Sequence, residues 1–143
     1  MPTLAIDRAS GRVTCGKGVV HPGSSPAELP PDVQWMSPGT PADDAGWTTG
    51  RVRTAGMQVD IQLRFQLSRL DRVVMVLTPP HHLGLSGDAF YLSVDERWNF
   101  HRRWLRRQLG QDLVFDWGSA GVGRDKSEEV FIWLDFSRQA EGD

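Results

Sequence analysis

The chain of 143 residues has the length of one globular domain, and its 16 Lys or Arg and 18 Asp or Glu leave a formal net charge of −2. This balance gives no overall attraction to nucleic acid or to anionic membranes, so we expect neither as a partner. A domain of this length buries enough surface to need no disulfide or metal ion, and the hydrophobic fraction of 39% is that of a globular protein. A single cysteine, Cys15, excludes an internal disulfide and favours a reducing compartment, so we expect a cytoplasmic protein.

Neither the first residues nor the longest apolar run predicts export or membrane insertion. Residues 1–7 lack the basic and apolar regions of a signal peptide. No apolar run is longer than Val73–Leu77, which has the length of a strand and falls far short of the ~20 residues of a membrane span. We therefore expect a single domain over residues 1–143, with a flexible tail at 137–143.

The N-terminal third combines one hairpin with a long loop-rich segment. Residues 4–6 and 13–15 alternate apolar and polar side chains around a glycine turn, which predicts two paired strands. Residues 16–50 are rich in Gly, Pro, Ser and Asp and are expected to be mostly loop. A short helix is predicted there from Ser25, because Pro26 follows it and Glu28 stands three residues after the cap.

Two strands are predicted in the middle of the chain, after a short strand at 52–54. Residues 59–67 alternate strictly, which indicates one buried and one wet face. The apolar set is Val59, Ile61, Leu63, Phe65 and Leu67, and the polar set is Asp60, Gln62, Arg64 and Gln66. The apolar run within 70–77 predicts a central strand that ends before two prolines.

Residues 95–109 are predicted to form the principal helix. Ser93 and Glu96 match a capping box, and Gly110 stands where a left-handed residue would end the helix. The helical period places an apolar face on one side, formed by Trp98, His101, Trp104, Leu105, Gln108 and Leu109. We expect this face to lie on the apolar side of the strand at 59–67. The other side carries Arg102, Arg103, Arg106 and Arg107, which are either a solvated helix surface or a docking surface for an acidic partner or nucleic acid.

A second hairpin is predicted at the end of the chain. A strand at 113–117 continues through the glycines of 118–123, and residues 130–136 alternate back. The predicted order is β-β-(short α)-β-β-β-α-β-β, an α+β fold with a mainly antiparallel sheet and one principal amphipathic helix packed on one face.

Most candidate chemical motifs have a simpler structural interpretation. His81-His82 follows two prolines, and adjacent side chains are expected to diverge, so no zinc site is predicted. His101 is expected at the edge of the core, bonded to a neighbouring carbonyl. The glycines before Lys126 resemble a phosphate loop, but a strand follows them instead of a helix. The acidic pairs Asp43-Asp44 and Glu128-Glu129 lie in predicted turns and point apart, and Cys15 is expected to be buried and inert.

The face of the sheet opposite the helix is the most informative feature. Phe131 and Trp133 are out of phase with the buried residues of the last strand, so both should project from the face that carries Asp60, Gln62 and Arg64. Two large aromatics on a polar face need a cover, which is the segment 16–50, a second subunit or a ligand.

Residues 90–136 resemble a group of small bacterial proteins without an assigned activity, which occur as products of integron-type mobile gene cassettes and beside toxin immunity genes. The residues that carry the resemblance are His101-Arg102-Arg103-Trp104-Leu105, Gln108-Leu109-Gly110, Phe115-Asp116-Trp117-Gly118 and the strand 130–136. Where these proteins often carry Tyr-Asp after the glycine, this chain has Val122-Gly123-Arg124. The resemblance implies an accessory protein and assigns no catalytic residue.

We interpret the chain as a non-enzymatic binding or interaction protein that contacts a protein partner or a second copy of itself through the outer sheet face. A small-molecule-binding module that uses the aromatic face or a pocket is the alternative. An enzyme comes third, because no pair of nucleophile and base and no set of metal ligands can be assembled from the sequence. No catalytic or metal-binding residue is predicted, and no cofactor is expected.

Overall fold

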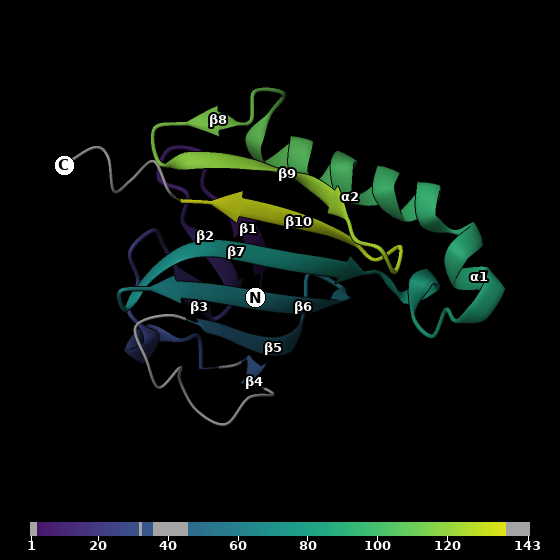
Figure 1. The fold of residues 1–143 in the computed structure, drawn as a ribbon, viewed down its shortest axis with the longest axis horizontal. Helices are drawn as coiled ribbons and strands as arrows, with labels where there is room; N and C mark the ends of the chain where they lie inside the picture. Colours follow the sequence, from purple (N-terminus) through teal and green to yellow (C-terminus); the bar gives the residue numbers. More distant parts are fainter. Residues whose placement is uncertain (1–2, 32, 36–45, 137–143) are drawn as a thin grey trace.

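The computed structural model describes residues 3–31, 33–35 and 46–136, which form two antiparallel sheets and two α-helices (Figure 1). The smaller sheet has the strand order β1-β2-β3, and the larger has the order β4-β5-β6-β7-β10-β9-β8. The strands of the smaller sheet are β1 (Thr3–Ile6), β2 (Val13–Gly16) and β3 (Gly18–Val20). Those of the larger sheet are β4 (Gln34–Trp35), β5 (Gly46–Thr54), β6 (Met57–Gln66), β7 (Arg69–Thr78), β8 (Val114–Phe115), β9 (Gly118–Arg124) and β10 (Val130–Asp135). The helices are α1 (Gly87–Leu92) and α2 (Val94–Leu109), and two 3-10 turns are η1 (Pro26–Glu28) and η2 (Pro80–His82).

The α+β class with mainly antiparallel sheet is confirmed, and so is the alternation that predicted it. In β6 the odd-numbered residues from Val59 to Phe65 are almost fully buried. In β10 the even-numbered residues from Val130 to Leu134 are buried in the same core. Because β7 lies between these strands, the larger sheet has one continuous apolar inner face.

Two different elements cover this inner face. Helix α2 packs chiefly against β9 and β10, and β2 of the smaller sheet contacts β5. Figure 1 shows the smaller sheet and α2 on the same side of the larger sheet, with the opposite side in front. The expectation that α2 rests mainly on β6 is therefore wrong. The N-terminal hairpin forms a second sheet beside the helix, and the apolar residues of both contribute to one core.

The start of α2 differs from the predicted capping box. Ser93 precedes the helix, but its hydroxyl donates to the carbonyl of Phe90 and accepts from Arg97, so it does not cap the first turn. The reason is α1, which runs into α2 and leaves no extended residue before it. The other end is as predicted, because Gly110 has a φ of 83° and its N–H donates to the carbonyl of Arg106.

The segment 16–50 contains more regular structure than predicted. It includes β3, η1, β4 and the first residues of β5, and the helix predicted at Ser25 is the 3-10 turn η1. In that turn the Ser25 N–H donates to the Glu28 carboxylate at 2.9 Å. Strands β3 and β4 have only three and two residues, so they are too short to show the alternation by which a strand is identified. Asp43-Asp44 and the tail 137–143 lie outside the described residues.

The C-terminal strand predicted at 113–117 is broken into a separate hairpin. Only Val114–Phe115 pair as β8, the chain turns at Asp116–Trp117, and the glycine-rich stretch forms β9. No helix follows these glycines in the described chain, so they do not form a phosphate loop.

Cys15 is fully buried. Among the residues described, we find no helix with both the length and the apolar character that crossing a membrane requires.

Candidate functional site

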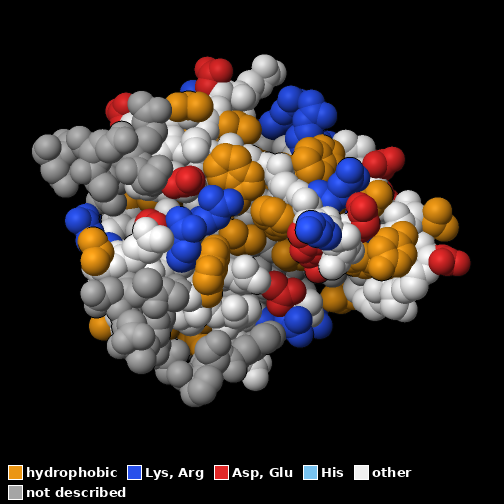
Figure 2. Space-filling view, in the orientation of Figure 1, with side chains coloured by type: hydrophobic (Ala, Val, Ile, Leu, Met, Phe, Trp, Pro, Cys, Tyr) orange, Lys and Arg blue, Asp and Glu red, His pale blue; other side chains and the backbone are white. Residues whose placement is uncertain are grey.

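The outer face of the larger sheet brings together all five residues of the predicted interaction surface. Antiparallel pairing sets Trp47, Arg64 and Arg72 in one row across β5, β6 and β7. The next row runs through Thr49, Gln62, Val74, Trp133 and Gly121. A third row contains Arg51, Asp60 and Val76. Figure 2 looks onto this face and shows hydrophobic side chains beside arginines over its middle.

The two aromatic rings of β10 lie over glycines of β9 on this face. Trp133 pairs with Gly121 and Phe131 with Gly123. A methyl group on Gly121 would lie 2.6 Å from the Trp133 ring, and one on Gly123 would lie 2.6 Å from the Phe131 ring. Both rings therefore occupy the space that a side chain on the paired glycine would fill, and both residues are partly exposed. Trp47 lies on the same outer face, in β5, and is 46% exposed.

Three arginines on the outer face are paired with carboxylates of the same chain. Arg64 makes a bidentate pair with Asp71 at 2.9 and 3.0 Å. Arg51 bonds Asp60 at 2.7 Å, and the Arg72 and Asp135 side chains approach to 3.7 Å. Two of these guanidinium groups also lie over indole rings, Arg64 at 5.7 Å from Trp47 and Arg72 at 5.4 Å from Trp133. We call the aromatic rings and these ion pairs together the outer-face patch.

A shallow hollow of about 280 Å³ lies within this patch. Its wall includes Trp47, Gln62, Arg72, Val74 and Phe131. The described residues of the segment 16–50 do not form a layer over it, since β3 belongs to the smaller sheet and β4 and β5 extend the larger sheet. The hollow joins aromatic and charged groups on one surface, which is the composition of many interface centres.

A second, more enclosed cavity of about 180 Å³ lies where β7 ends beside η2 and α2. Polar side chains make up much of its wall, among them Asp60, His82, Arg97, His101 and Glu129. Arg97, His101 and His82 are each at most 6% exposed, so three basic side chains are buried around one small space. Such a concentration is uncommon in a core and requires specific partners.

Arg97 has those partners, and they make it a structural residue. Its guanidinium donates to the carbonyl of Phe90 at 2.7 Å and to the carbonyl of Glu128 at 2.8 Å. It also lies over the Phe90 ring at 4.0 Å and within 3.9 Å of the Glu129 carboxylate. Arg97 thereby ties α1 and α2 to the turn between β9 and β10.

His101 is buried and neutral, and both of its ring nitrogens are bonded. Nε2 accepts from the backbone N–H of Leu77 at 2.9 Å, and Nδ1 lies 2.7 Å from the carbonyl of Arg97. This pair of contacts fixes the Nδ1–H tautomer. Burial lowers the His101 pKa to about 4, and the nearby charges of Arg97 and His82 act in the same direction. A core histidine bonded to a carbonyl was predicted, and its bond to a strand N–H was not.

Two other groups of the cavity have shifted pKa values. Burial raises the pKa of Glu129, the charge of Arg97 opposes this, and Asp125 and Asp60 add to the rise. Burial lowers the pKa of His82, and the neighbouring His81 lowers it further. Glu128 and Glu129 point to different partners, Arg124 and Arg97, as adjacent residues in a turn were expected to do.

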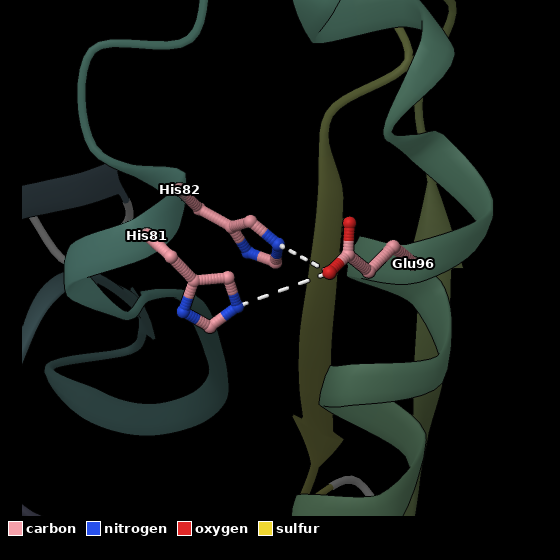
Figure 3. Close-up of side chains that lie close together, drawn as sticks. All are labelled: His81, His82 and Glu96. Atoms are coloured by element: carbon pink, nitrogen blue, oxygen red, sulfur yellow. Dashed lines mark ion pairs between the residues drawn. The ribbon is translucent and has the colours of Figure 1, made fainter.

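His81 and His82 converge with Glu96, contrary to expectation. The turn η2 brings the two rings to 4.2 Å between centroids, although the residues are adjacent. Glu96, from the first turn of α2, places Oε1 3.7 Å from His82 Nε2 and 4.0 Å from His81 Nε2 (Figure 3). The sequence prediction assigned Glu96 to a capping box and let the histidines diverge. Their meeting depends on η2 and α1, and neither element was predicted.

The second predicted surface is spread over the solvent side of α2. Arg102, Arg103, Arg106 and Arg107 are all exposed. Arg97, which the prediction omitted, belongs to the buried stripe, because it precedes His101 by four residues and Trp104 by seven. An arginine among the apolar positions of the helix was the feature of the sequence that could have predicted the polar cavity.

No protein-family model, curated protein or solved structure matches this chain. Its function is therefore inferred from its own residues.

Proposed function

We propose that this chain is a non-enzymatic interaction protein that self-associates through the outer-face patch, in an accessory role of the gene-cassette or immunity type. The observation that carries the proposal is the pair Trp133 and Phe131, which lie over Gly121 and Gly123 and are partly exposed on the outer face. Exposed apolar area of this kind gains about 25 cal/mol per Å² when it is covered. Tryptophan and arginine, which neighbour each other here, are the residues most enriched at the centres of interfaces.

A second copy of the chain fits this face better than a strongly charged partner. The arginines of the patch already have carboxylate partners in the same chain, so covering the patch leaves no isolated charge. A partner of one charge sign would meet both attractive and repulsive groups. A copy related by a twofold axis presents the same mixture, and its net charge of −2 adds little repulsion.

The size of the face also suits a dimer. Strands β5, β6 and β7 contain 9, 10 and 10 residues, and the shorter strands β10 and β9 contain 6 and 7. With strands about 4.8 Å apart and a rise of about 3.3 Å per residue, the five strands present roughly 600–700 Å². A stable interface of standard size covers about 800 Å² on each partner, so the face supplies most of that area.

Cross-saturation between isotopically labelled and unlabelled copies tests the proposal. Saturating the unlabelled copy should attenuate signals of Gln62, Val74 and the Trp133 indole in the labelled copy. Attenuation at Arg102 and Arg106 instead would assign the interface to the arginine face of α2. Absence of transfer at high concentration would refute self-association.

The hollow of about 280 Å³ supports a small-molecule-binding module as the second candidate. Its wall joins Trp47 and Phe131 to Arg72, a set that suits a flat ligand with an anionic group. In that case Trp133→Glu and Arg72→Ala would change ligand-induced tryptophan fluorescence and leave the mass in solution unchanged.

A further inference from the structure

We propose that His81, His82 and Glu96 form a binding site for one divalent transition-metal ion, with Zn²⁺ the expected ion. The site is separate from the outer-face patch, so it stands or falls independently of the proposed function. It reverses the expectation that the two histidines diverge.

The spacing of the three donors is close to that of a metal site. One oxygen of Glu96 lies 3.7 Å from His82 Nε2 and 4.0 Å from His81 Nε2, and one ligand atom from each residue lies within 4.8 Å of the others. Tetrahedral zinc with bonds of 2.0–2.2 Å separates its ligand atoms by about 3.4 Å. The donors therefore need to close by between about 0.3 and 1.4 Å. The side chains of His81 and Glu96 are 61% and 63% exposed, which leaves them free to do so.

His82 gives an independent reason to place a ligand here. Its side chain is 3% exposed, and in the part of the chain described neither ring nitrogen has a hydrogen-bond partner. Buried ring nitrogens almost always have a partner, so an unbonded pair calls for an explanation. The distance of 3.7 Å to Glu96 is too long for a hydrogen bond, whereas an ion between the two groups would bond both. Figure 3 shows His81 and His82 directed toward the same oxygen of Glu96.

The types of donor select the ion. Two imidazoles and one carboxylate suit Zn²⁺, Cu²⁺ or Ni²⁺, whereas Mg²⁺ and Ca²⁺ prefer sites made of oxygen alone. Three protein ligands leave a fourth position for water. The free nitrogen of a metal-bound histidine usually bonds a carbonyl, a carboxylate or water. His82 also lines the polar cavity of about 180 Å³, which has room for such a water.

Titration of the protein, free of any histidine tag, with zinc sulfate tests the site by calorimetry. We expect one Zn²⁺ per chain with micromolar or tighter affinity, and no binding of Mg²⁺. His81→Ala and Glu96→Gln change exposed side chains, so both variants should fold, and each should weaken Zn²⁺ binding at least about tenfold. Saturating Zn²⁺ should also raise the melting temperature of the wild type by about 3 °C or more, and that of the variants less.

His21 and Glu28 provide a matched control. Their side chains approach to 3.8 Å, as in the proposed site, but the described residues supply no second histidine there. His21→Ala should leave the affinity for Zn²⁺ unchanged. The proposal is overturned if the wild type does not bind Zn²⁺, if Mg²⁺ binds equally well, or if His21→Ala weakens binding as much as His81→Ala.

Discussion

His101 Nε2 accepts a hydrogen bond from the backbone N–H of Leu77 at 2.9 Å, so a helix side chain bonds the main chain of a sheet strand. Because the other ring nitrogen faces the carbonyl of Arg97, the ring is held in one neutral tautomer. Protonation would turn the Nε2 acceptor into a donor that faces another donor. The contact between α2 and β7 therefore requires an uncharged imidazole.

We expect the free energy of unfolding to fall in mild acid because of His101. Its pKa is about 4 in the folded chain and near 6.5 in the unfolded chain, so the unfolded state binds the proton first. The contribution of neutral His101 to the free energy of unfolding is complete above pH 6.5 and is lost as the pH falls toward 4. It amounts to about 3 kcal/mol in total. Urea unfolding across this range measures it. His101→Gln should flatten the dependence, and a curve unchanged from that of the wild type would contradict the assignment.

Leu105 and Arg106 are neighbours on α2 with opposite environments. Leu105 is 1% exposed in the core, so Leu105→Ala should lower the free energy of unfolding by about 2–5 kcal/mol. Arg106 is exposed, and Arg106→Ala should change it by about 0.5 kcal/mol or less. Equal losses in chemical denaturation would mean that the helix is rotated.

Arg97 should matter more than any exposed arginine of α2. Arg97→Met removes the donors to the carbonyls of Phe90 and Glu128, and we expect a loss of about 2–4 kcal/mol in the free energy of unfolding. Arg102→Met is the matched control on the solvent side and should be close to neutral. Denaturant titration of both variants decides, and similar losses would show that the buried hydrogen bonds contribute little.

Gly121 should be required for full stability of the fold, because the Trp133 ring occupies the space where a side chain on Gly121 would lie. Gly121→Val in the wild type should lower the free energy of unfolding by about 1–3 kcal/mol, since the ring must move. In a Trp133→Ala background the same change should cost little or even stabilise the strand. An equal loss in both backgrounds would place the strain elsewhere.

Strict alternation predicted the central part of the fold. In residues 59–65 the odd-numbered side chains are apolar, and in residues 130–136 the even-numbered ones are. This difference alone predicted that Trp133 and Phe131 lie on the face of Asp60, Gln62 and Arg64. The structure places them there. The same reasoning failed for β3 and β4, which have three and two residues and cannot show a period.

The polar cavity and the histidine cluster could be predicted only in part. Arg97 lies on the apolar stripe of α2, so its burial could have been inferred from its helical position. The approach of His81 and His82 to Glu96 depends on a 3-10 turn and on α1, whose six residues include no buried one and carry little periodic signal. The position of the Trp133 ring over Gly121 depends on the pairing register of β9 and β10, and neither strand specifies that register alone.

Sedimentation equilibrium of the wild type, Trp133→Glu and Leu92→Glu tests self-association through the outer-face patch most directly. Leu92 is the matched control, because it is 84% exposed on α1 and lies outside the patch. At high micromolar concentration the wild type and Leu92→Glu should have twice the chain mass of 16.0 kDa, and Trp133→Glu should have the mass of one chain. A wild type that remains a 16.0 kDa monomer, or a Trp133→Glu variant that still dimerises, would contradict the account.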